Sequence, residues 1–327
     1  MKIAIIGAGI SGLVVARELT KLAKITVFEK ARGVGGRMAT RSIDDYQFDH
    51  GSQHFFVKTA AFKNFLQPLE EQKIISRWDA DFCEIDFDKI VHRIKWSKEN
   101  PHFVGAPKMN NLCKYLATDI DVKSQVQVKN IVKKNNQWQL FDLENQSLGE
   151  FDWVISTAPA KQTADLMPEC FCHLQQVKNI KMTGCFSLML AFEKPLEISW
   201  QAALVRNSKI SWISLDSSKP QRISKNCLVV HSTNSWAEEN IENDLDLLKS
   251  ELINELSQII GFNANEAIHA NIHRWRYANI SKQKGDESLV DKVNKLATCG
   301  DWLIHGRIES AFTSSMNLVD KIKPLLS

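Results

Sequence analysis

The fold of this chain is decided by its opening stretch, Lys2-Ile3-Ala4-Ile5-Ile6-Gly7-Ala8-Gly9-Ile10-Ser11-Gly12. The part before the glycines is short and almost wholly apolar, which is typical of a strand buried on both faces of a parallel sheet. An amphipathic helix is expected from Ser11 to about Leu22, and a second strand, Ile25–Phe28, ends at Glu29. This order of strand, glycine-rich turn, helix and strand predicts the first unit of a doubly wound α/β fold.

The glycines match the pattern G-x-G-x-x-G, and each has a separate task. Gly7 permits a tight turn, Gly9 lets the backbone approach a pyrophosphate, and Gly12 lets the helix pack closely on the strand. The N-terminus of the helix supplies free N–H groups at the positive end of the helix dipole. Such a helix start favours phosphate groups.

Glu29 stands about 20 residues beyond the first glycine, where a dinucleotide fold places the acid that binds the adenosine ribose hydroxyls. A carboxylate there repels a 2′-phosphate, so the site is not built for an NADP-type adenosine. A glycine-rich turn without a ligand is the alternative, but the preceding strand, the following helix and the acid all favour a dinucleotide site. The fingerprint alone does not separate NAD from FAD.

A second glycine-rich loop follows the acid directly, from Lys30 to Arg37. Its Gly35-Gly36-Arg37 resembles the G-G-R motif of the amine-oxidase-like flavoproteins, which share a glutathione-reductase-type FAD domain. The glycines would let the backbone run against the cofactor, and Arg37 would offer a planar fork to phosphate oxygens. The alternative is a flexible surface loop whose arginine meets solvent.

Further blocks narrow this resemblance to the renalase family. Gly33–Arg41 and Phe48-Asp49-His50-Gly51-Ser52-Gln53-His54-Phe55-Phe56 are similar to its R-G-x-G-G-R-M-A-T-R and F-D-H-G-A-Q-Y-F signatures, with His54 where tyrosine is common. Val104–Met109, His273–Ala278, Gly300–Trp302 and Arg307–Ala311 match later blocks in family order. The resemblance therefore covers essentially the whole chain.

The resemblance implies a non-covalent FAD, although a thioether to Cys299 is conceivable. The residues expected to bind FAD are Gly7, Gly9, Ile10, Ser11, Gly12, Glu29, Lys30, Gly35, Gly36, Arg37, Gly51, Ser52, Gln53, His54, Val128, Ala158, Pro159, Asp301, Ile308 and Glu309.

The predicted fold class is α/β, with a glutathione-reductase-type FAD-binding Rossmann domain assembled from separated segments and a mixed-sheet α+β substrate domain. The FAD domain is expected at 1–57, 107–164 and 291–327, and the substrate domain at 58–106 and 165–290. Within them, Gln125–Val132 alternates as a strand, and a helix is expected around Ile241–Ile260 with a stop at Gly261.

Composition limits the partners. Hydrophobic residues make up 44% and charged residues 24%, an ordinary balance for a globular protein. The net charge of +3 is too small and too scattered to indicate a nucleic-acid or membrane partner. The seven cysteines have irregular spacings and no zinc pattern, which favours reduced thiols and a cytoplasmic location.

Renalase-like proteins oxidise the 2- and 6-dihydro isomers of NAD(P)H to NAD(P)+, passing hydride to flavin N5 and then reducing O2 to hydrogen peroxide. The resemblance implies this activity and a dihydronicotinamide substrate. A flavin amine oxidase, a flavin desaturase or isomerase acting on a lipid, and a flavin-binding redox sensor without turnover remain as alternatives.

Three residues are candidates for the substrate site. Trp275 is favoured as a stacking wall because its block resembles a family motif near the flavin. His273 is either a catalytic base or a satisfied strand histidine, and Trp236 is either a cleft wall or a packing residue. Of Arg274 and Arg276, one is expected in solvent or an ion pair, while the other could face the cleft.

Overall fold

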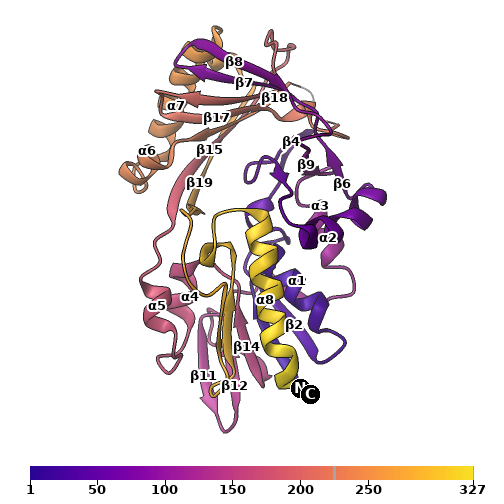
Figure 1. Cartoon of the computed structure of the whole chain (residues 1–327). Coiled ribbons are helices and arrows are strands. Elements are labelled where there is room, and N and C mark those ends of the chain that lie inside the picture. The colour runs from indigo at the N-terminus through magenta and orange to yellow at the C-terminus, as the bar shows by residue number, and fades with distance from the viewer. Residues whose placement is uncertain (224–225, 327) are drawn as a thin grey trace. The chain divides into compact units, whose positions relative to one another are not determined.

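The computed structural model describes residues 1–223 and 226–326 and divides the chain into two compact units (Figure 1). Unit 1 contains 1–37, 112–182 and 280–327, and unit 2 contains 38–111 and 183–279. Compared with the expected domains, 38–57 and 107–111 belong to unit 2, whereas 165–182 and 280–290 belong to unit 1.

Unit 1 is built on a six-stranded sheet whose strands are parallel except at one edge. In spatial order the strands are β10 (Val122–Ser124), β2 (Lys24–Glu29), β1 (Lys2–Ile6), β14 (Trp153–Ser156), β21 (Leu296–Cys299) and β20 (Ser288–Asp291). The burial of β1 and β14 is almost complete, because helices cover a parallel sheet on its faces. The sheet confirms the predicted Rossmann-like α/β fold.

Two helices from opposite ends of the sequence pack together in this unit. α1 (Ile10–Leu19) packs against α8 (Ile308–Leu326), and α8 buries Leu318, Val319 and Ile322. α1 ends earlier than the expected Leu22, because the chain turns after Thr20 to enter β2. The shorter helices are α3 (Asn111–Leu116), which begins at the boundary between the units, α4 (Ala160–Leu166) and α5 (Leu174–Lys178).

A three-stranded antiparallel sheet formed by β11 (Asn130–Lys134), β12 (Gln137–Phe141) and β13 (Ser147–Phe151) also belongs to unit 1. The expected strand from Gln125 was wrong in its first half. Gln125 has a φ of 61°, and the backbone N–H groups of Gln125 and Val126 donate to the carbonyls of Ala31 and Glu29 instead of extending β11.

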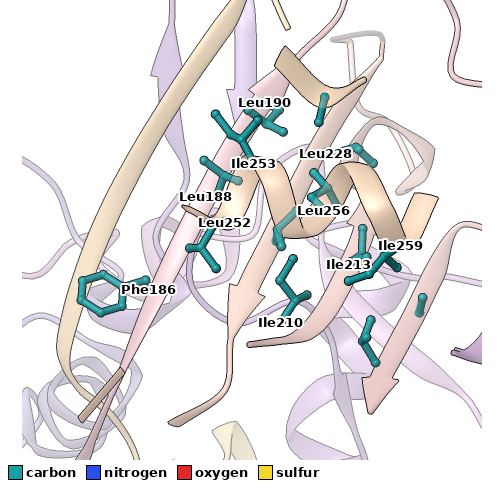
Figure 2. Packing of buried hydrophobic residues seen from close by; sticks show 14 of the residues in the cluster. Phe186, Leu188, Leu190, Ile210, Ile213, Leu228, Leu252, Ile253, Leu256 and Ile259 are labelled. Carbon is teal, nitrogen blue, oxygen red and sulfur yellow. The ribbon is translucent and has the colours of Figure 1, made fainter. Parts of the chain in front are cut away.

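Unit 2 is built on a seven-stranded mixed sheet. In spatial order the strands are β19 (His269–Asn279), β15 (Thr183–Ala191), β18 (Cys227–Ser232), β17 (Ile210–Leu215), β16 (Ala202–Arg206), β7 (Asp81–Asp86) and β8 (Lys89–Lys95). α7 (Leu245–Ile260) covers one face, and its buried leucines and isoleucines share one cluster with Leu188 and Leu190 of β15 (Figure 2).

The bounds of α7 follow from its caps. Asp244 accepts hydrogen bonds from the N–H groups of Asp246 and Leu247, which begins the helix four residues later than the expected Ile241. Gly261 has a φ of 75° and ends it where the sequence predicted. A separate short helix, α6 (Asn234–Glu239), precedes it.

The remaining elements of unit 2 are small. They are β3 (Arg41–Ile43), β4 (Tyr46–Phe48), β5 (Phe55–Phe56), α2 (Ala60–Glu71), β6 (Ile75–Arg77) and β9 (His102–Gly105). The segment 49–54 connects β4 to β5, and Phe48 lies in a buried cluster with Met189, Cys227 and Val229. Among residues 1–223 and 226–326, no helix combines the length and apolar character needed to cross a membrane.

Candidate functional site

Each of the three glycines after β1 stands at a position where a side chain would disturb the site. Gly7 has a φ of 105°, which disfavours other residues. A Cβ at Gly12 would lie 2.0 Å from the carbonyl oxygen of Gly7 and 2.8 Å from Thr157 Oγ1, so Gly12 permits the close packing of α1. A Cβ at Gly9 would meet no heavy atom within 4 Å in the described part of the chain, so the surface above Gly9 is open.

The second glycine loop lies directly against the first. The Gly35 N–H donates to the Ala8 carbonyl at 2.9 Å, and a Cβ at Gly36 would stand 3.3 Å from Gly9 Cα. Gly35 and Gly36 have φ values of 131° and 53°, which L side chains rarely adopt. The two loops therefore form one bare backbone surface at the start of α1.

The Glu29 carboxylate lies beside this surface at the end of β2. One oxygen accepts the N–H of Ala8 and the other that of Ala31, both at 2.8 Å. These bonds hold the side chain in place and leave further lone pairs on both oxygens for hydroxyl donors. Val126 donates its N–H to the Glu29 carbonyl. This hydrogen bond keeps the chain near Glu29 two residues before the buried Val128.

Two other elements of unit 1 border the glycine loops. After β14, Thr157 Oγ1 donates to the carbonyls of Ile6 and Gly7 at 3.1 Å, and Ala158 and Pro159 follow. α8 begins at Ile308 with Glu309 in its first turn, and Ser315 Oγ donates to the Ser11 carbonyl at 3.1 Å. The first turn of α1 therefore contacts the N-terminal half of α8.

Arg37 and Asp301 bind each other. Arg37 Nη1 donates to Asp301 Oδ2 at 2.8 Å, and Nη2 donates to Oδ1, so the pair is bidentate. The sequence predicted separate contacts of each residue with a cofactor. Asp301 is 4% exposed, and it orients the guanidinium while balancing its charge.

These features fit a dinucleotide. The bare glycine backbone accepts a diphosphate at the start of α1, and the fixed Glu29 carboxylate accepts ribose hydroxyls. Lys30 lies nearby but is exposed, and its Nζ contacts Gln162 Oε1 at 3.3 Å. Cys299 is fully buried, and its burial raises the pKa of the thiol to about 12, so it stays protonated and unreactive.

In unit 2, a row of polar and aromatic side chains crosses the sheet on the face opposite α7. Trp212 of β17 is paired with His231 of β18, His231 with Ser187 of β15, and Ser187 with His273 of β19. Directly opposed residues share a face, so these four residues form a line. Ser187 is fully buried, and its hydroxyl has no partner among the residues that the structure describes.

The segment 49–54 follows this row, and three of its residues contact three of the row's four members. The ring of His50 lies 5.0 Å from that of His273, and the ring of His54 lies 5.2 Å from that of Trp212. Gln53 Nε2 lies 3.4 Å from His231 Nε2.

Trp275 stands two residues beyond His273 on β19, on the same face of the sheet, and so extends the row. It stacks on His50 at 5.2 Å and donates its Nε1–H to the His50 carbonyl at 2.8 Å. His54 also lies among Trp96, His102 and Phe56, with ring centroids 4.9 to 6.1 Å away. Unit 2 therefore carries a surface rich in flat rings.

The imidazoles of His231 and His273 in the row, and that of His50 beside them, are uncharged at neutral pH. Burial, followed by the charges of His273 and Arg41, lowers the pKa of His50 to about 3. Burial and Lys219 lower the pKa of His231 to about 4, and burial and Arg41 lower the pKa of His273 to about 4. Such rings are weak bases.

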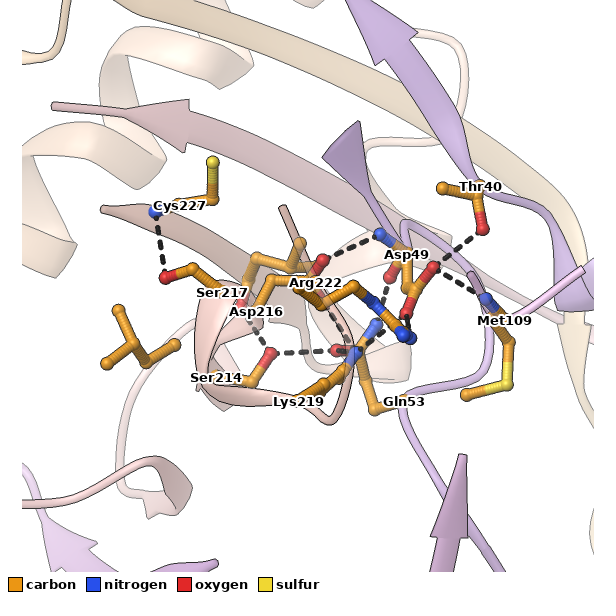
Figure 3. Close-up of polar contacts among 12 residues, drawn as sticks. Thr40, Asp49, Gln53, Met109, Ser214, Asp216, Ser217, Lys219, Arg222 and Cys227 are labelled. Atoms are coloured by element: carbon orange, nitrogen blue, oxygen red, sulfur yellow. Dashed lines mark hydrogen bonds and ion pairs between the residues drawn. The ribbon is translucent and has the colours of Figure 1, made fainter. Parts of the chain in front are cut away.

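A buried charge cluster, formed by Asp49, Asp216, Lys219 and Arg222, holds the segment 49–54 (Figure 3). Their side chains are at most 1% exposed. Lys219 Nζ donates to Asp216 Oδ1 at 2.5 Å and to Asp49 Oδ2 at 3.4 Å, and Arg222 donates to Asp49 Oδ2.

Asp49 is the best-connected member of the charge cluster. Its other oxygen accepts Thr40 Oγ1–H at 2.6 Å and the Met109 N–H at 3.0 Å. Burial acts to raise the pKa of Asp49, but Lys219 and Arg222 outweigh it and keep the pKa below its usual value. Asp49 is therefore a fixed carboxylate.

The structure brings some of the expected residues together and not others. His273, Trp275, Gln53 and His54 meet along the row, and Gly51 and Ser52 lie in the same segment. Trp236 lies elsewhere: its ring contacts Phe186 edge-on at 5.6 Å and packs on the core beneath α7.

Arg274 and Arg276 are both away from the row. Arg274 donates to the Asn243 carbonyl, and Arg276 forms an ion pair with Glu242. The expectation that one of them could face the cleft was wrong, because residues two apart on a strand share a face. That face is opposite to the face of His273 and Trp275.

Several residues of unit 2 were missed by the sequence analysis. They are Ser187, Trp212, Asp216, Lys219, Arg222 and His231. A signal was present for Ser187, a hydroxyl within the apolar part of a strand of nine residues, Thr183–Ala191. The charged residues follow β17 in a polar stretch that looks like an ordinary solvated loop.

Comparison with known proteins agrees with this geometry. Residues 5–69 match the model of an NAD(P)-binding Rossmann-like domain. Among curated proteins, the 4,4'-diapophytoene desaturase (4,4'-diaponeurosporene-forming) of Staphylococcus aureus strain Newman is 36% identical over 94 residues. That match covers 26% of this chain and only 19% of the desaturase.

Solved structures share the fold over nearly the whole chain. A putative protoporphyrinogen oxidase from Exiguobacterium sp. 255-15 has a TM-score of 0.79 at 12% identity, covering 99% of both chains. An oxidoreductase from Methanosarcina mazei has a TM-score of 0.72 at 15% identity, covering 98% of this chain and all (100%) of the other. A putrescine oxidase triple mutant has a TM-score of 0.70 at 11% identity, covering 99% of both chains.

The family follows from the longest of these matches. Residues 96–322, well over half of the chain, match the model of the flavin containing amine oxidoreductases. Together with the dinucleotide-binding features of unit 1, this match identifies the cofactor as FAD. The chain belongs to the flavin containing amine oxidoreductase family, and it is an FAD-dependent oxidoreductase.

Proposed function

We propose that this enzyme is a renalase-like oxidase, which converts isomeric dihydronicotinamides, the 2- and 6-dihydro forms of NAD(P)H, to NAD(P)+. The ordered blocks from Gly33–Arg41 to Arg307–Ala311 support this substrate class, because they resemble the renalase family along the whole chain. We further propose that the enzyme acts in the cytoplasm on a small-molecule substrate and O2.

The observation that carries the proposal is the uncharged state of His231 and His273 in the row and of His50 beside them. The pKa values of His50, His231 and His273 are about 3, 4 and 4, so none is an effective base or a cation near neutral pH. Loss of hydride from a dihydropyridine gives an aromatic cation directly, so no proton has to be removed from the substrate. Neutral flat rings suit such a substrate and its cationic product.

The roles of the residues follow from their contacts. Bound FAD would accept the hydride at N5 and pass the electrons to O2, giving hydrogen peroxide. Trp275, locked by its stacking on His50 and its hydrogen bond to the His50 carbonyl, would form the wall on which the nicotinamide stacks. His273 would support this wall, since its ring lies edge-on to Trp275 at 4.4 Å.

We also propose that FAD is held without a covalent bond by the residues predicted from the sequence. In unit 1 these are Gly7, Gly9, Ile10, Ser11, Gly12, Glu29, Lys30, Gly35, Gly36, Arg37, Val128, Ala158, Pro159, Asp301, Ile308 and Glu309. In unit 2 they are Gly51, Ser52, Gln53 and His54. The paired Arg37 and Asp301 would act as one unit with little net charge.

An anaerobic titration of the purified yellow protein tests the proposed reaction. Flavin absorbance near its long-wavelength band is followed while the 2- and 6-dihydro isomers of NADH, then ordinary NADH, then a panel of amines and finally a carotenoid precursor and other lipids are added. We expect fast bleaching by at least one isomer, NAD+ as the product, and a weak response to the other compounds. Air should then restore the colour rapidly.

Other outcomes point to other functions. Bleaching by an amine alone would make the protein an amine oxidase, and bleaching by a carotenoid precursor or another lipid alone would make it a desaturase. No bleaching by any compound would leave a flavin-binding redox sensor. Trp275→Phe should slow bleaching by the isomer while keeping FAD, whereas Trp236→Phe, on the α7 face, serves as the matched control.

A further inference from the structure

Arg41 brings a guanidinium group to the face of the sheet that carries the row. It is paired with Phe48 in the hairpin of β3 and β4, and directly opposed residues share a face. Phe48 shares a buried cluster with Met189 of β15, which lies two residues from Ser187 and therefore on the same face of that strand. The side chain of Arg41 thus extends from the hairpin towards the row.

A hydrogen bond to the neighbouring strand fixes the guanidinium group. Arg41 Nη1 donates to Asn271 Oδ1 at 2.6 Å. Asn271 lies two residues before His273 and four before Trp275 on β19, so these three side chains share a face. A strand rises about 3.3 Å per residue, which places Asn271 about 7 Å from His273 and about 13 Å from Trp275 along β19. All four residues are partly exposed, so a ligand can reach them.

The charge of Arg41 is not balanced by an acid. Among residues 1–223 and 226–326, Asn271 is the only side chain that binds it. Asp44, in the turn of the same hairpin, contacts His269 Nε2 at 3.5 Å instead. The guanidinium group has five N–H donors, and a single bond to Asn271 leaves most of them for a ligand.

The field of this charge reaches the rings beside Trp275. Burial is the largest cause of the lowered pKa of His50 and of His273, and the charge of Arg41 contributes to the lowering in both. Both imidazoles are uncharged at neutral pH, so neither adds a second cation nor supplies a counter-charge. Arg41 is therefore an uncompensated cation next to the wall formed by Trp275.

We propose that Arg41, held by Asn271, forms an anion subsite, which binds the phosphate group next to the nicotinamide ring of the substrate while that ring stacks on Trp275. The inference rests on the proposed function for the identity of the anion, and it concerns residues of unit 2 alone. A nicotinamide nucleotide carries its phosphate one ribose away from the ring, and β19 offers a stacking position and a cationic position on one face.

The chemistry of the subsite suits a phosphate. The planar fork of an arginine matches phosphate oxygens, and such charge-assisted hydrogen bonds are stronger than neutral ones. The Asn271 oxygen is occupied by Arg41, which turns the role of its NH2 group to that of a further donor, and this group has no protein partner in the described part of the chain. The subsite therefore presents donors only.

A comparison of substrates that differ only in the phosphate tests the proposal. Anaerobic bleaching of the FAD-loaded full chain is measured with a dihydro isomer of nicotinamide mononucleotide and with the same isomer of nicotinamide riboside. We expect Arg41→Met to raise the mononucleotide concentration for half-maximal bleaching rate roughly 10- to 100-fold, with little change in the maximal rate. The riboside should bleach both proteins equally, and Arg41→Lys should restore part of the affinity for the mononucleotide.

Arg93→Met is the matched control. Arg93 lies on β8 at the opposite edge of the same sheet, and its Nη2 donates to Ser199 Oγ at 3.0 Å. This variant should treat both substrates as the wild type does. Equal losses with mononucleotide and riboside in Arg41→Met would show that Arg41 only ties the hairpin to β19, and would overturn the proposal. A loss in Arg93→Met as large as that in Arg41→Met would overturn it too.

Calorimetry with inorganic diphosphate tests the subsite without any oxidation. Bound FAD fills the dinucleotide site of unit 1, so the added diphosphate reports on other sites. We expect wild type and Arg93→Met to bind it alike, and Arg41→Met to bind it at least about tenfold more weakly. If this difference is found but no dihydronicotinamide bleaches the flavin, the proposed function fails and the anion subsite stands. No binding by the wild type, or equal binding by Arg41→Met, overturns the subsite whatever the substrate is.

The wild type alone keeps the proposal testable where Arg41→Met fails to fold. Inorganic diphosphate should compete with the mononucleotide and raise the concentration that it needs for half-maximal bleaching rate. It should leave bleaching by the riboside unchanged, because the riboside does not use the Arg41 subsite. Diphosphate that affects both substrates equally, or neither of them, would contradict the assignment.

Discussion

Among the glycines that the structure describes, Gly12 has the least room for a Cβ. A Cβ there would lie 2.0 Å from the Gly7 carbonyl oxygen, which is backbone and cannot move aside. We expect Gly12→Ala to displace α1, to lower the free energy of unfolding by about 3 kcal/mol and to abolish FAD retention. Urea unfolding and the flavin content of the purified protein measure the two effects.

Gly33→Ala is the matched control for this prediction. Gly33 is exposed, and a Cβ there would meet no heavy atom within 4 Å in the described part of the chain. The Gly33 variant should therefore keep its flavin and its stability. A Gly12→Ala protein with wild-type flavin content would mean that α1 need not pack as closely as the structure shows.

Glu29 gives a second prediction at the residue scale. Each carboxylate oxygen accepts a backbone N–H, from Ala8 and Ala31, and a glutamine side chain in its place would have only one such acceptor. The NH2 group of that glutamine would face a donor, and the charge would be lost. We expect Glu29→Gln to raise the Kd of FAD about 10- to 100-fold, measured by fluorescence titration of the apoprotein.

Glu18→Gln is the comparison for Glu29→Gln. Glu18 is an exposed carboxylate in the same unit, paired with Lys323 at 3.2 Å, and this variant should bind FAD as the wild type does. Equal affinities of the Glu29 and Glu18 variants would contradict the role of Glu29.

The residue scale also shows where prediction from sequence stops. Gly7, Gly12 and Glu29 follow a local pattern with a physical meaning, so they could be identified without a structure. Lys219 and Arg222 could not, because they resemble surface charges until Asp49, about 170 residues away, is brought beside them. Buried ion pairs between distant segments leave no periodic signal.

At the scale of elements, the row of Trp212, His231, Ser187 and His273 depends on the register of the four strands that carry these residues. A shift of one residue in β18 or β19 would move His231 or His273 to the α7 face. Gly261 correctly marked the end of α7. Register was not predictable, since alternation fixes the two faces of a strand but not its partner residues.

The row predicts how stability depends on pH. His50, His231 and His273 have pKa values of about 3, 4 and 4 in the folded protein, against the ordinary value of 6.5. Between these values the unfolded chain binds more protons, so stability is complete above about pH 6.5 and falls as the pH drops towards 4. Each such histidine contributes a slope of up to about 1.4 kcal/mol per pH unit.

Urea unfolding at several pH values from neutral to mildly acidic checks this slope. His273→Gln should make stability less sensitive to acid, because one of the protonating groups is gone. His92→Gln, which changes an exposed histidine of β8, should leave the slope as it is. A slope that is the same in all three proteins would show that folding does not lower the pKa of His273.

At the scale of the whole molecule, the two units are interleaved along the chain, which passes between them after residues 37, 111, 182 and 279. The separated segments of the FAD domain were predicted from the returning motifs near Asp301. The crossing points were less accessible to sequence, because the resemblance is continuous from Gly33 to Arg41, while the structural unit changes at Met38. Motif continuity therefore does not mark a unit boundary.

The interleaving has a consequence for cofactor binding. Residues 1–279 contain all of unit 2 and the whole G-x-G-x-x-G motif, but lack β20, β21, Asp301 and the helix α8 that packs on α1. We expect this truncated chain to be purified without flavin absorbance and to bind no added FAD, although its fingerprint is intact. Full-length Asp301→Asn, which keeps β21 and α8, should retain FAD with reduced affinity. A yellow 1–279 protein would mean that the first two segments of unit 1 form the FAD site without the third.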